Sequence, residues 1–277
     1  MKPEPWIEGL GFPEGPRWHA GRLWFSDFGE RVVRAVDALG GVTEVLRLAA
    51  RPSGLGWLSD DSLLVVSMDD QRLLRFADGA LTTHAELASF TSEPCNDMVV
   101  SASGNAYVGH MGFDLFARPR TIRHAELILV RPDGSCAVAA DQLLFPNGVV
   151  LSADQRTLIV AETFGQRLTA FTVAADGSLT DRRIFAPLPG RSPDGICLDA
   201  EGAVWVADAA GKACVRVREG GEITDVVQTE HGCFACVLGG SEGRTLFLCT
   251  AEGYDRAALA RRTGAIERVD VDVARAD

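Results

Sequence analysis

Short apolar runs separated by polar or glycine-containing turns recur along the whole chain. Six of these runs read "LWF", "LLVVS", "AYVG", "LIVAE", "VWVAD" and "LFLC". Each is short and rich in residues that favour β-strands. A tight polar segment precedes every one of them, reading "HAGR", "SDDS", "ASGN", "ADQR", "AEGA" and "SEGR". Such segments are typical hairpin turns, so the pattern predicts a chain of antiparallel strand pairs.

The predicted hairpins repeat at a regular interval. The first run of each begins with a variable residue followed by a glycine or its stand-in, at Glu14, Ser53, Asn96, Asn147, Asp194 and Phe234. Their separations are 39, 43, 51, 47 and 40 residues. A period of this size, with only short strands inside each unit, is typical of a four-stranded propeller blade. We therefore predict an all-β fold, a six-bladed β-propeller whose four-stranded antiparallel blades surround a central channel, as a single domain over residues 1–277.

The ends of the chain are expected to close the ring. Residues 6–10 precede the first unit, and "IERVDVDV" from Ile266 follows the last. We expect one of these segments to add a strand to the blade of the other, which removes an exposed sheet edge. The rival α/β fold needs amphipathic helices between the strands. Only residues 122–130 offer a weak candidate for such a helix.

The variable position carries candidate chemistry. In a propeller the first strand of each blade lines the channel, so equivalent residues at the start of these strands meet near the axis. Glu14, Asn96, Asn147 and Asp194 would bring two carboxylates and two amide oxygens together, a donor set that suits a hard cation. Any one of "PEG", "PNG" and "PDG" is also a common turn sequence. Their shared register predicts a metal site.

These motifs carry a family resemblance. "FPEGPRW", "CNDM", "FPNG" and "SPDGI", in that order, resemble the regucalcin/gluconolactonase family of metal-dependent lactonases over nearly the whole chain. The resemblance implies a hydrolase that opens cyclic esters, with one divalent cation bound by Glu14, Asn147 and Asp194. Calcium is the first expectation for this metal, with zinc, manganese and iron as alternatives. The resemblance also implies catalytic roles for Asp194, as general base, and for Asn96, which would orient water or substrate.

Two departures from the family concern the substrate. Pro94 stands where members that act on sugar lactones often carry arginine, and Phe113 and Asp114 stand where they carry a substrate-binding glutamate. We therefore expect a lactone less polar than gluconolactone, contacted by Asn96, His110, Phe113 and Asp114. His110 ends a second strand and is expected to face the channel mouth. The alternative for His110 is a purely structural, hydrogen-bonded role.

The longest interval predicts one further element of the mouth. The third unit exceeds the mean length, and its excess lies near "GFDLFARPRTIRHAE". A loop at this place would overhang the channel, so we interpret it as a substrate lid, the alternative being a surface insertion.

Composition and charge exclude several classes of protein. The net charge of −11 leaves no basic face for nucleic acid. No apolar run reaches the length of a membrane span, and the first residues do not resemble a signal peptide. Seven cysteines, an odd number, favour a reduced and cytoplasmic protein over a disulfide framework. The expected partner is a small lactone, and the oligomeric state stays open.

Two further motifs match known functional patterns, and two further functions are compatible with the predicted site. "GGSEG" around Ser241 matches the serine-hydrolase pattern, but it falls at a hairpin turn on the opposite face and precedes no helix. "CFAC" is a lone pair of cysteines in a core strand, for which packing is the expected role. The alternatives to a lactonase are a metal-dependent esterase or phosphotriesterase, and a non-catalytic calcium-binding propeller.

Overall fold

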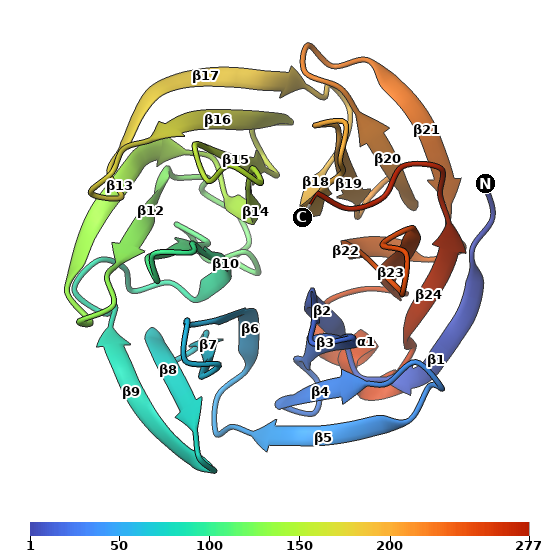
Figure 1. The fold of residues 1–277 in the computed structure, drawn as a ribbon, viewed down its shortest axis with the longest axis horizontal. Helices are drawn as coiled ribbons and strands as arrows, with labels where there is room; N and C mark the ends of the chain where they lie inside the picture. The colour runs from blue at the N-terminus through green and yellow to red at the C-terminus, as the bar shows by residue number, and fades with distance from the viewer. Residues whose placement is uncertain (277) are drawn as a thin grey trace.

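Six antiparallel sheets of four strands each stand around a central axis (Figure 1). This computed structural model describes residues 1–276, apart from the side chain of Arg256. In five sheets the strands follow one another in sequence order from the innermost strand outward, and in the sixth the outermost strand is the first of the chain. The six-bladed β-propeller predicted from the repeat is confirmed. That it forms a single domain over residues 1–277 stays a prediction, and Asp277 lies outside the described residues.

From the axis outward, the strands of the first three blades are β2 (Pro13–His19), β3 (Arg22–Asp27), β4 (Val32–Val36) and β5 (Val42–Arg47); β6 (Pro52–Trp57), β7 (Leu63–Ser67), β8 (Arg72–Ala77) and β9 (Ala80–Glu86); and β10 (Cys95–Val100), β11 (Ala106–His110), β12 (Ala125–Val130) and β13 (Cys136–Leu143). Those of the last three are β14 (Pro146–Leu151), β15 (Thr157–Glu162), β16 (Arg167–Val173) and β17 (Leu179–Pro187); β18 (Pro193–Leu198), β19 (Val204–Asp208), β20 (Ala213–Val217) and β21 (Ile223–Gln228); and β22 (Gly232–Gly239), β23 (Thr245–Ala251), β24 (Gly264–Asp270) and β1 (Glu4–Leu10).

The ring is closed by the first strand of the chain. Strand β1 pairs antiparallel with β24 and becomes the outermost strand of the sixth blade, with Leu10 opposite Gly264. The predicted closure by a terminal segment is therefore confirmed. The end of the chain adds a second tie, because Arg275 bridges to Asp199 and Ala276 donates a hydrogen bond to the carbonyl of Leu198 in blade five.

The hydrophobic core is divided among the gaps between blades. Six clusters of buried apolar side chains each join two neighbouring blades, as Tyr107 of blade three does with Leu158 of blade four. Burial of apolar area of this kind is the main stabilising contribution to folding. The outermost strands face water on one side, so residues such as Val138 and Ile184 are exposed.

Helix is nearly absent from the described residues. The candidate segment 122–130 contains strand β12 instead. The single helix described, α1 (Arg256–Arg261), follows β23, and its N-cap Asp255 accepts a hydrogen bond from the backbone N–H of Ala258. Among residues 1–276, no helix has the length and apolar character needed to cross a membrane.

Candidate metal centre

The innermost strand of every blade contains a β-bulge at the variable position. In the four blades that carry a carboxylate or an amide at this position, the register shifts between Glu14 and Arg17, Cys95 and Met98, Pro146 and Val149, and Pro193 and Ile196. A bulge re-aims the side chain beside it. Glu14, Asn96, Asn147 and Asp194 consequently line one cavity of about 500 Å³.

Close approach between neighbouring inner strands explains why glycine follows the variable residue. A Cβ atom on Gly148 would lie 2.5 Å from the backbone nitrogen of Ile196, and one on Gly195 would lie 2.5 Å from the Cβ of Ala235. Near the axis the blades leave no room for a side chain at this point. In blade three Asp97 follows Asn96, and it forms an ion pair with Arg17 at 2.7 Å.

A chain of hydrogen bonds connects the polar residues on the cavity floor. The Asn96 side chain donates from Nδ2 to Oδ1 of Asn147 at 2.8 Å. Asn147 donates from Nδ2 to the hydroxyl of Thr163 at 3.2 Å, and that hydroxyl donates to the carbonyl of Pro193 at 2.8 Å. These bonds fix both amide orientations, so Oδ1 of Asn147 keeps a second lone pair for another partner. The chain links blades three, four and five beside Asp194.

Among the described residues, neither carboxyl group of the floor forms an ion pair with a cationic side chain. Burial raises the pKa of Glu14 well above its usual range, and the Asp194 carboxylate raises it further. Burial and then the Asp97 carboxylate raise the pKa of Asp194 in the same way. The nearest cation, Arg17, is already paired with Asp97. Two desolvated carboxylates without a cation of their own form a favourable environment for a bound positive ion.

The donor set fits a hard divalent cation. Within the described part of the chain, no three His, Cys, Asp or Glu side chains come together in a way that would hold a metal ion. The floor instead offers carboxylates from Glu14 and Asp194 and the amide oxygen of Asn147, all lining the same cavity. Oxygen donors of this kind suit calcium, magnesium and manganese better than soft metals. The assignment of these three residues as ligands stays a prediction.

Aromatic side chains form much of the cavity wall. Phe12, Phe28 and Phe234 line one side, where the rings of Phe12 and Phe234 lie 4.7 Å apart. Phe145 and Phe164 line another, with centroids 5.5 Å apart in an edge-to-face arrangement. The space above the polar floor is therefore suited to carbon-rich groups.

Two loops meet over this cavity. The loop of residues 111–124, predicted as a lid, contributes Met111, Leu115, Phe116 and Arg120 to its lining. A second loop, residues 252–263 with α1, contributes Tyr254, whose ring lies 6.0 Å from that of Phe116. The repeat along the sequence does not predict the second loop.

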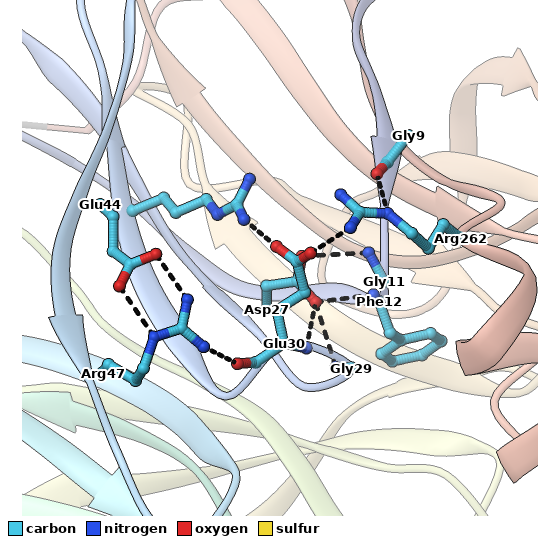
Figure 2. Close-up of polar contacts among 10 residues, drawn as sticks. Gly9, Gly11, Phe12, Asp27, Gly29, Glu30, Glu44, Arg47 and Arg262 are labelled. Atoms are coloured by element: carbon cyan, nitrogen blue, oxygen red, sulfur yellow. Dashed lines mark hydrogen bonds and ion pairs between the residues drawn. The ribbon is translucent and has the colours of Figure 1, made fainter.

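The second loop is fastened to blade one. Arg262 donates a hydrogen bond from Nε to the carbonyl of Gly9 at 2.8 Å and pairs with Glu30 (Figure 2). Glu30 also pairs with Arg34 and, through its backbone carbonyl, accepts from Arg47. The wall that carries Tyr254 therefore rests on a network of charged groups.

Acidic residues at the ends of second strands hold loops in place. Asp27 accepts hydrogen bonds from the backbone N–H groups of Gly11, Phe12, Gly29 and Glu30 (Figure 2). Asp208 does the same for Ser192 and Gly211. Both carboxylates therefore stabilise the loops around the ends of their strands.

The other predicted substrate contacts do not line the cavity. His110 is buried, and its Nε2 lies 2.8 Å from a carboxylate oxygen of Glu126, the residue whose backbone N–H it also contacts. Phe113 packs behind the wall, with its ring 5.2 Å from that of Phe164. Asp114 is exposed and accepts from the N–H of Phe116, so it shapes the lid loop. Of the predicted contacts, Asn96 lies on the cavity floor.

The remaining motifs lie apart from this site. Ser241 lines a separate cavity beside Trp6 and Trp18 at the hairpin end of blade six. Cys233 and Cys236 are buried in the cluster between blades five and six, which confirms the packing role expected for "CFAC". All seven cysteines are free thiols.

Known proteins that are similar to this chain include regucalcins and a pentonolactonase. Regucalcin of Gallus gallus is 26% identical over 260 residues, covering 90% of this chain and 86% of its own. A pentonolactonase of Haloferax volcanii is 25% identical over 250 residues, covering 87% and 81%. The solved structure of a regucalcin from Agrobacterium tumefaciens, described as a calcium-binding protein, superposes with a TM-score of 0.80 at 24% identity, covering 96% and 92%.

A family model described as the SMP-30/gluconolactonase/LRE-like region matches residues 12–252. The match includes every inner strand of the ring and all four polar residues of the cavity floor. The resemblance seen in the four motifs is thereby confirmed, and the chain belongs to the SMP-30/gluconolactonase/LRE-like family.

Proposed function

We propose that this protein is a metal-dependent lactonase that hydrolyses the ring ester of a small lactone. The observation that carries the proposal is the convergence of Glu14, Asn147 and Asp194 on the floor of a cavity with aromatic walls. Family membership and the similarity to a protein named pentonolactonase support the same reaction.

The three floor residues would hold one divalent cation, with calcium as the first candidate. A bound divalent cation supplies polarisation of the lactone carbonyl and activation of water. Side chains of the protein would carry out proton transfer and orient the reactants. Asp194 would accept the proton of the attacking water, because its carboxylate lines the cavity and lies beside the side-chain amide of Asn147. Asn96, held by its bond to Asn147, would orient the water or the substrate carbonyl.

The cavity wall favours a lactone with few hydroxyl groups. Each hydroxyl that enters the cavity without a partner costs about 1–3 kcal/mol. Buried carbon surface contributes roughly 25 cal/mol per Å² in the opposite direction. The name of the pentonolactonase relative points to a sugar lactone, whereas the rings of Phe145 and Phe164 point to a less polar one. We propose faster hydrolysis of alkyl- or aryl-substituted lactones than of gluconolactone.

Two alternatives use the same floor. A cation at this place also supports hydrolysis of open-chain esters or phosphotriesters. The similarity to regucalcin, one example of which is described as calcium-binding, supports a calcium-binding propeller without catalysis.

A panel of substrates with and without chelator distinguishes these functions. We expect chelator-sensitive hydrolysis of substituted five- and six-membered lactones, after correction for spontaneous opening. Gluconolactone should show a lower kcat/KM, and p-nitrophenyl acetate and paraoxon should react slowly. A tenfold preference for gluconolactone would overturn the proposed polarity of the substrate. If no lactone showed chelator-sensitive turnover, the proposed lactonase activity would be overturned, and a non-catalytic calcium-binding propeller would be the remaining function.

A further inference from the structure

Positively charged side chains without carboxylate partners line one side of the cavity. Arg120 comes from the lid loop of blade three, and Lys212 comes from the loop between β19 and β20 of blade five. Arg120 donates from Nε to the carbonyl of Leu115 at 2.9 Å, and its guanidinium lies 5.5 Å from the ring centroid of Phe164. Lys212 donates to the carbonyl of Glu230 at 3.1 Å. Among the described residues, neither forms an ion pair with a carboxylate.

The other charged groups of the lining are already compensated. Arg51 forms an ion pair with Asp69, and Glu252 forms one with Arg261 at 3.0 Å. One divalent cation would balance Glu14 and Asp194. Arg120 and Lys212 then remain as two uncompensated positive charges in the cavity of a protein whose net charge is −11. Arg120 is half-buried and Lys212 is exposed, so both charges are open to solvent. Charges of one sign that line a cleft raise the local concentration of oppositely charged ligands.

A neutral donor lies between these two cations along the ring. Gln166 belongs to blade four and lines the same cavity. Its Oε1 accepts a hydrogen bond from the N–H of Gly190 at 2.9 Å, which leaves the amide nitrogen as its donor end. Blades three, four and five occupy consecutive sectors of the ring (Figure 1), so Arg120, Gln166 and Lys212 present donors from adjoining blades.

We infer that the substrate is a lactone whose ring carries one anionic substituent, such as a carboxylate, which Arg120 and Lys212 bind while the ring ester lies over the floor residues. The inference rests on the proposed function and narrows its substrate class. The aromatic wall accommodates the carbon skeleton, and the donors of blades three to five bind the charge. Arg120 is the principal contact, because its planar fork matches a carboxylate in a bidentate manner and its stacking on Phe164 holds it in place.

The test compares two lactones that differ only in charge. A five-membered lactone with a carboxymethyl substituent and its primary carboxamide have nearly the same shape. We expect kcat/KM for the acid to exceed that for the amide at least tenfold, with the difference in KM, and we expect added salt to reduce the preference. Equal values for the two lactones would overturn the inference.

Substitutions locate the effect. Arg120→Gln should raise KM for the acid at least tenfold and leave the amide within twofold, and Lys212→Gln should act in the same direction. Arg118→Gln is the matched control, because Arg118 lies in the same loop, is exposed and binds only carbonyl groups of that loop. Equal losses for acid and amide in Arg120→Gln would show that Arg120 acts through the structure of its loop, where it binds the carbonyl of Leu115, and would contradict the inference.

A binding measurement separates this inference from the proposed function. Calorimetry with 3-oxocyclopentaneacetate, a carbocycle that cannot be hydrolysed, and with its amide reports the anion site without turnover. Tighter binding of the acid, lost in Arg120→Gln, would support the anion site even if no lactone were hydrolysed. If neutral lactones were hydrolysed in a chelator-sensitive way and the acid were not preferred, the proposed lactonase function would stand and the proposed anion site would be rejected.

Discussion

Asn96 of blade three donates a hydrogen bond to the side-chain oxygen of Asn147 of blade four at 2.8 Å, on the floor of the aromatic cavity. The bond fixes which atom of Asn147 faces its other partners. Asn147 in turn donates to Thr163, so the amide cannot rotate without losing a second bond. A residue that we propose as a metal ligand is thus oriented by a neighbour that comes from another blade.

The first prediction follows from this relationship. Asn96→Ala removes the donor that orients Asn147, so we expect the affinity for Ca²⁺ or Mn²⁺ to fall about tenfold to a hundredfold. Isothermal titration calorimetry measures the affinity of both variants and of the natural protein for these cations. Asn105→Ala is the control, because Asn105 lies at the β10–β11 turn, where its side chain donates to Ser103. Unchanged affinity in Asn96→Ala would show that Asn147 needs no such support.

The second prediction concerns packing at the axis. Gly148→Ala would place a Cβ 2.5 Å from the backbone nitrogen of Ile196 and 2.6 Å from the carbonyl oxygen of Asp194. Because both contacts are backbone atoms, we expect the free energy of unfolding to fall by about 2 kcal/mol or more. In Gly253→Ala the new atom would lie 3.4 Å from the Cβ of Ala258, an ordinary contact. Urea denaturation should show a loss in the first variant only, and two equally stable variants would refute the packing argument.

The third prediction is a pH dependence of stability. Glu162 is fully buried and accepts hydrogen bonds from Arg167, Thr169 and the N–H of Leu144. Burial alone would raise the pKa of Glu162, but these partners outweigh it and lower the pKa overall. A lowered pKa in the folded state stabilises the fold above the unfolded value of about 4.3, and this contribution disappears as the pH falls through the folded pKa.

Glu162→Gln tests that sign. We expect the free energy of unfolding to fall by about 1–3 kcal/mol at pH 7, because the charge-assisted bonds are lost. The difference from the natural protein should shrink as the pH falls below about 4. Glu219→Gln, which breaks an exposed pair with Arg183, should stay within about 0.5 kcal/mol at every pH. A Glu162→Gln difference that grows toward low pH would have the wrong sign for this explanation.

The fourth prediction concerns the two loops over the cavity. Phe116→Ala removes the ring that contacts Tyr254, so an alkyl-substituted lactone should lose about 1–2 kcal/mol of binding, which is roughly fivefold to thirtyfold in KM. An unsubstituted lactone should be affected little. Ile184→Ala is the control, because Ile184 is similarly exposed but lies on the outer strand β17. Equal KM values for Phe116→Ala and the natural protein would show that the loop carrying Phe116 does not act as a substrate lid.

The repeat along the sequence predicts the ring and its inner strands well, because every blade must form buried strands and pack closely against its neighbours at the axis. Short apolar runs between polar turns define the strands, and close approach at the axis requires the glycine beside the variable residue. Glu14 and Asp194 are therefore found on one floor although 180 residues separate them.

Features outside the repeat are predicted less well. The position of His110 at a strand end does not determine whether its ring turns to the cavity or to Glu126 on the next strand. The second loop lies within the last unit, between β23 and β24, and no further unit follows to give an interval that would reveal it. Its signal was local, because Asp255 precedes "RAALAR", an N-cap before good helix formers.

The central claim is that Glu14, Asn147 and Asp194 bind one divalent cation on which lactone hydrolysis depends. The most direct measurement is a titration of the chelated protein with Ca²⁺, Mn²⁺ and Zn²⁺ while hydrolysis of a substituted lactone is followed. We predict no enzymatic turnover in the chelated protein, recovery that saturates at one cation per chain for at least one of these metals, and no recovery in Asp194→Asn. Full activity in the chelated protein, or metal-dependent activity in Asp194→Asn equal to that of the natural protein, would contradict the account.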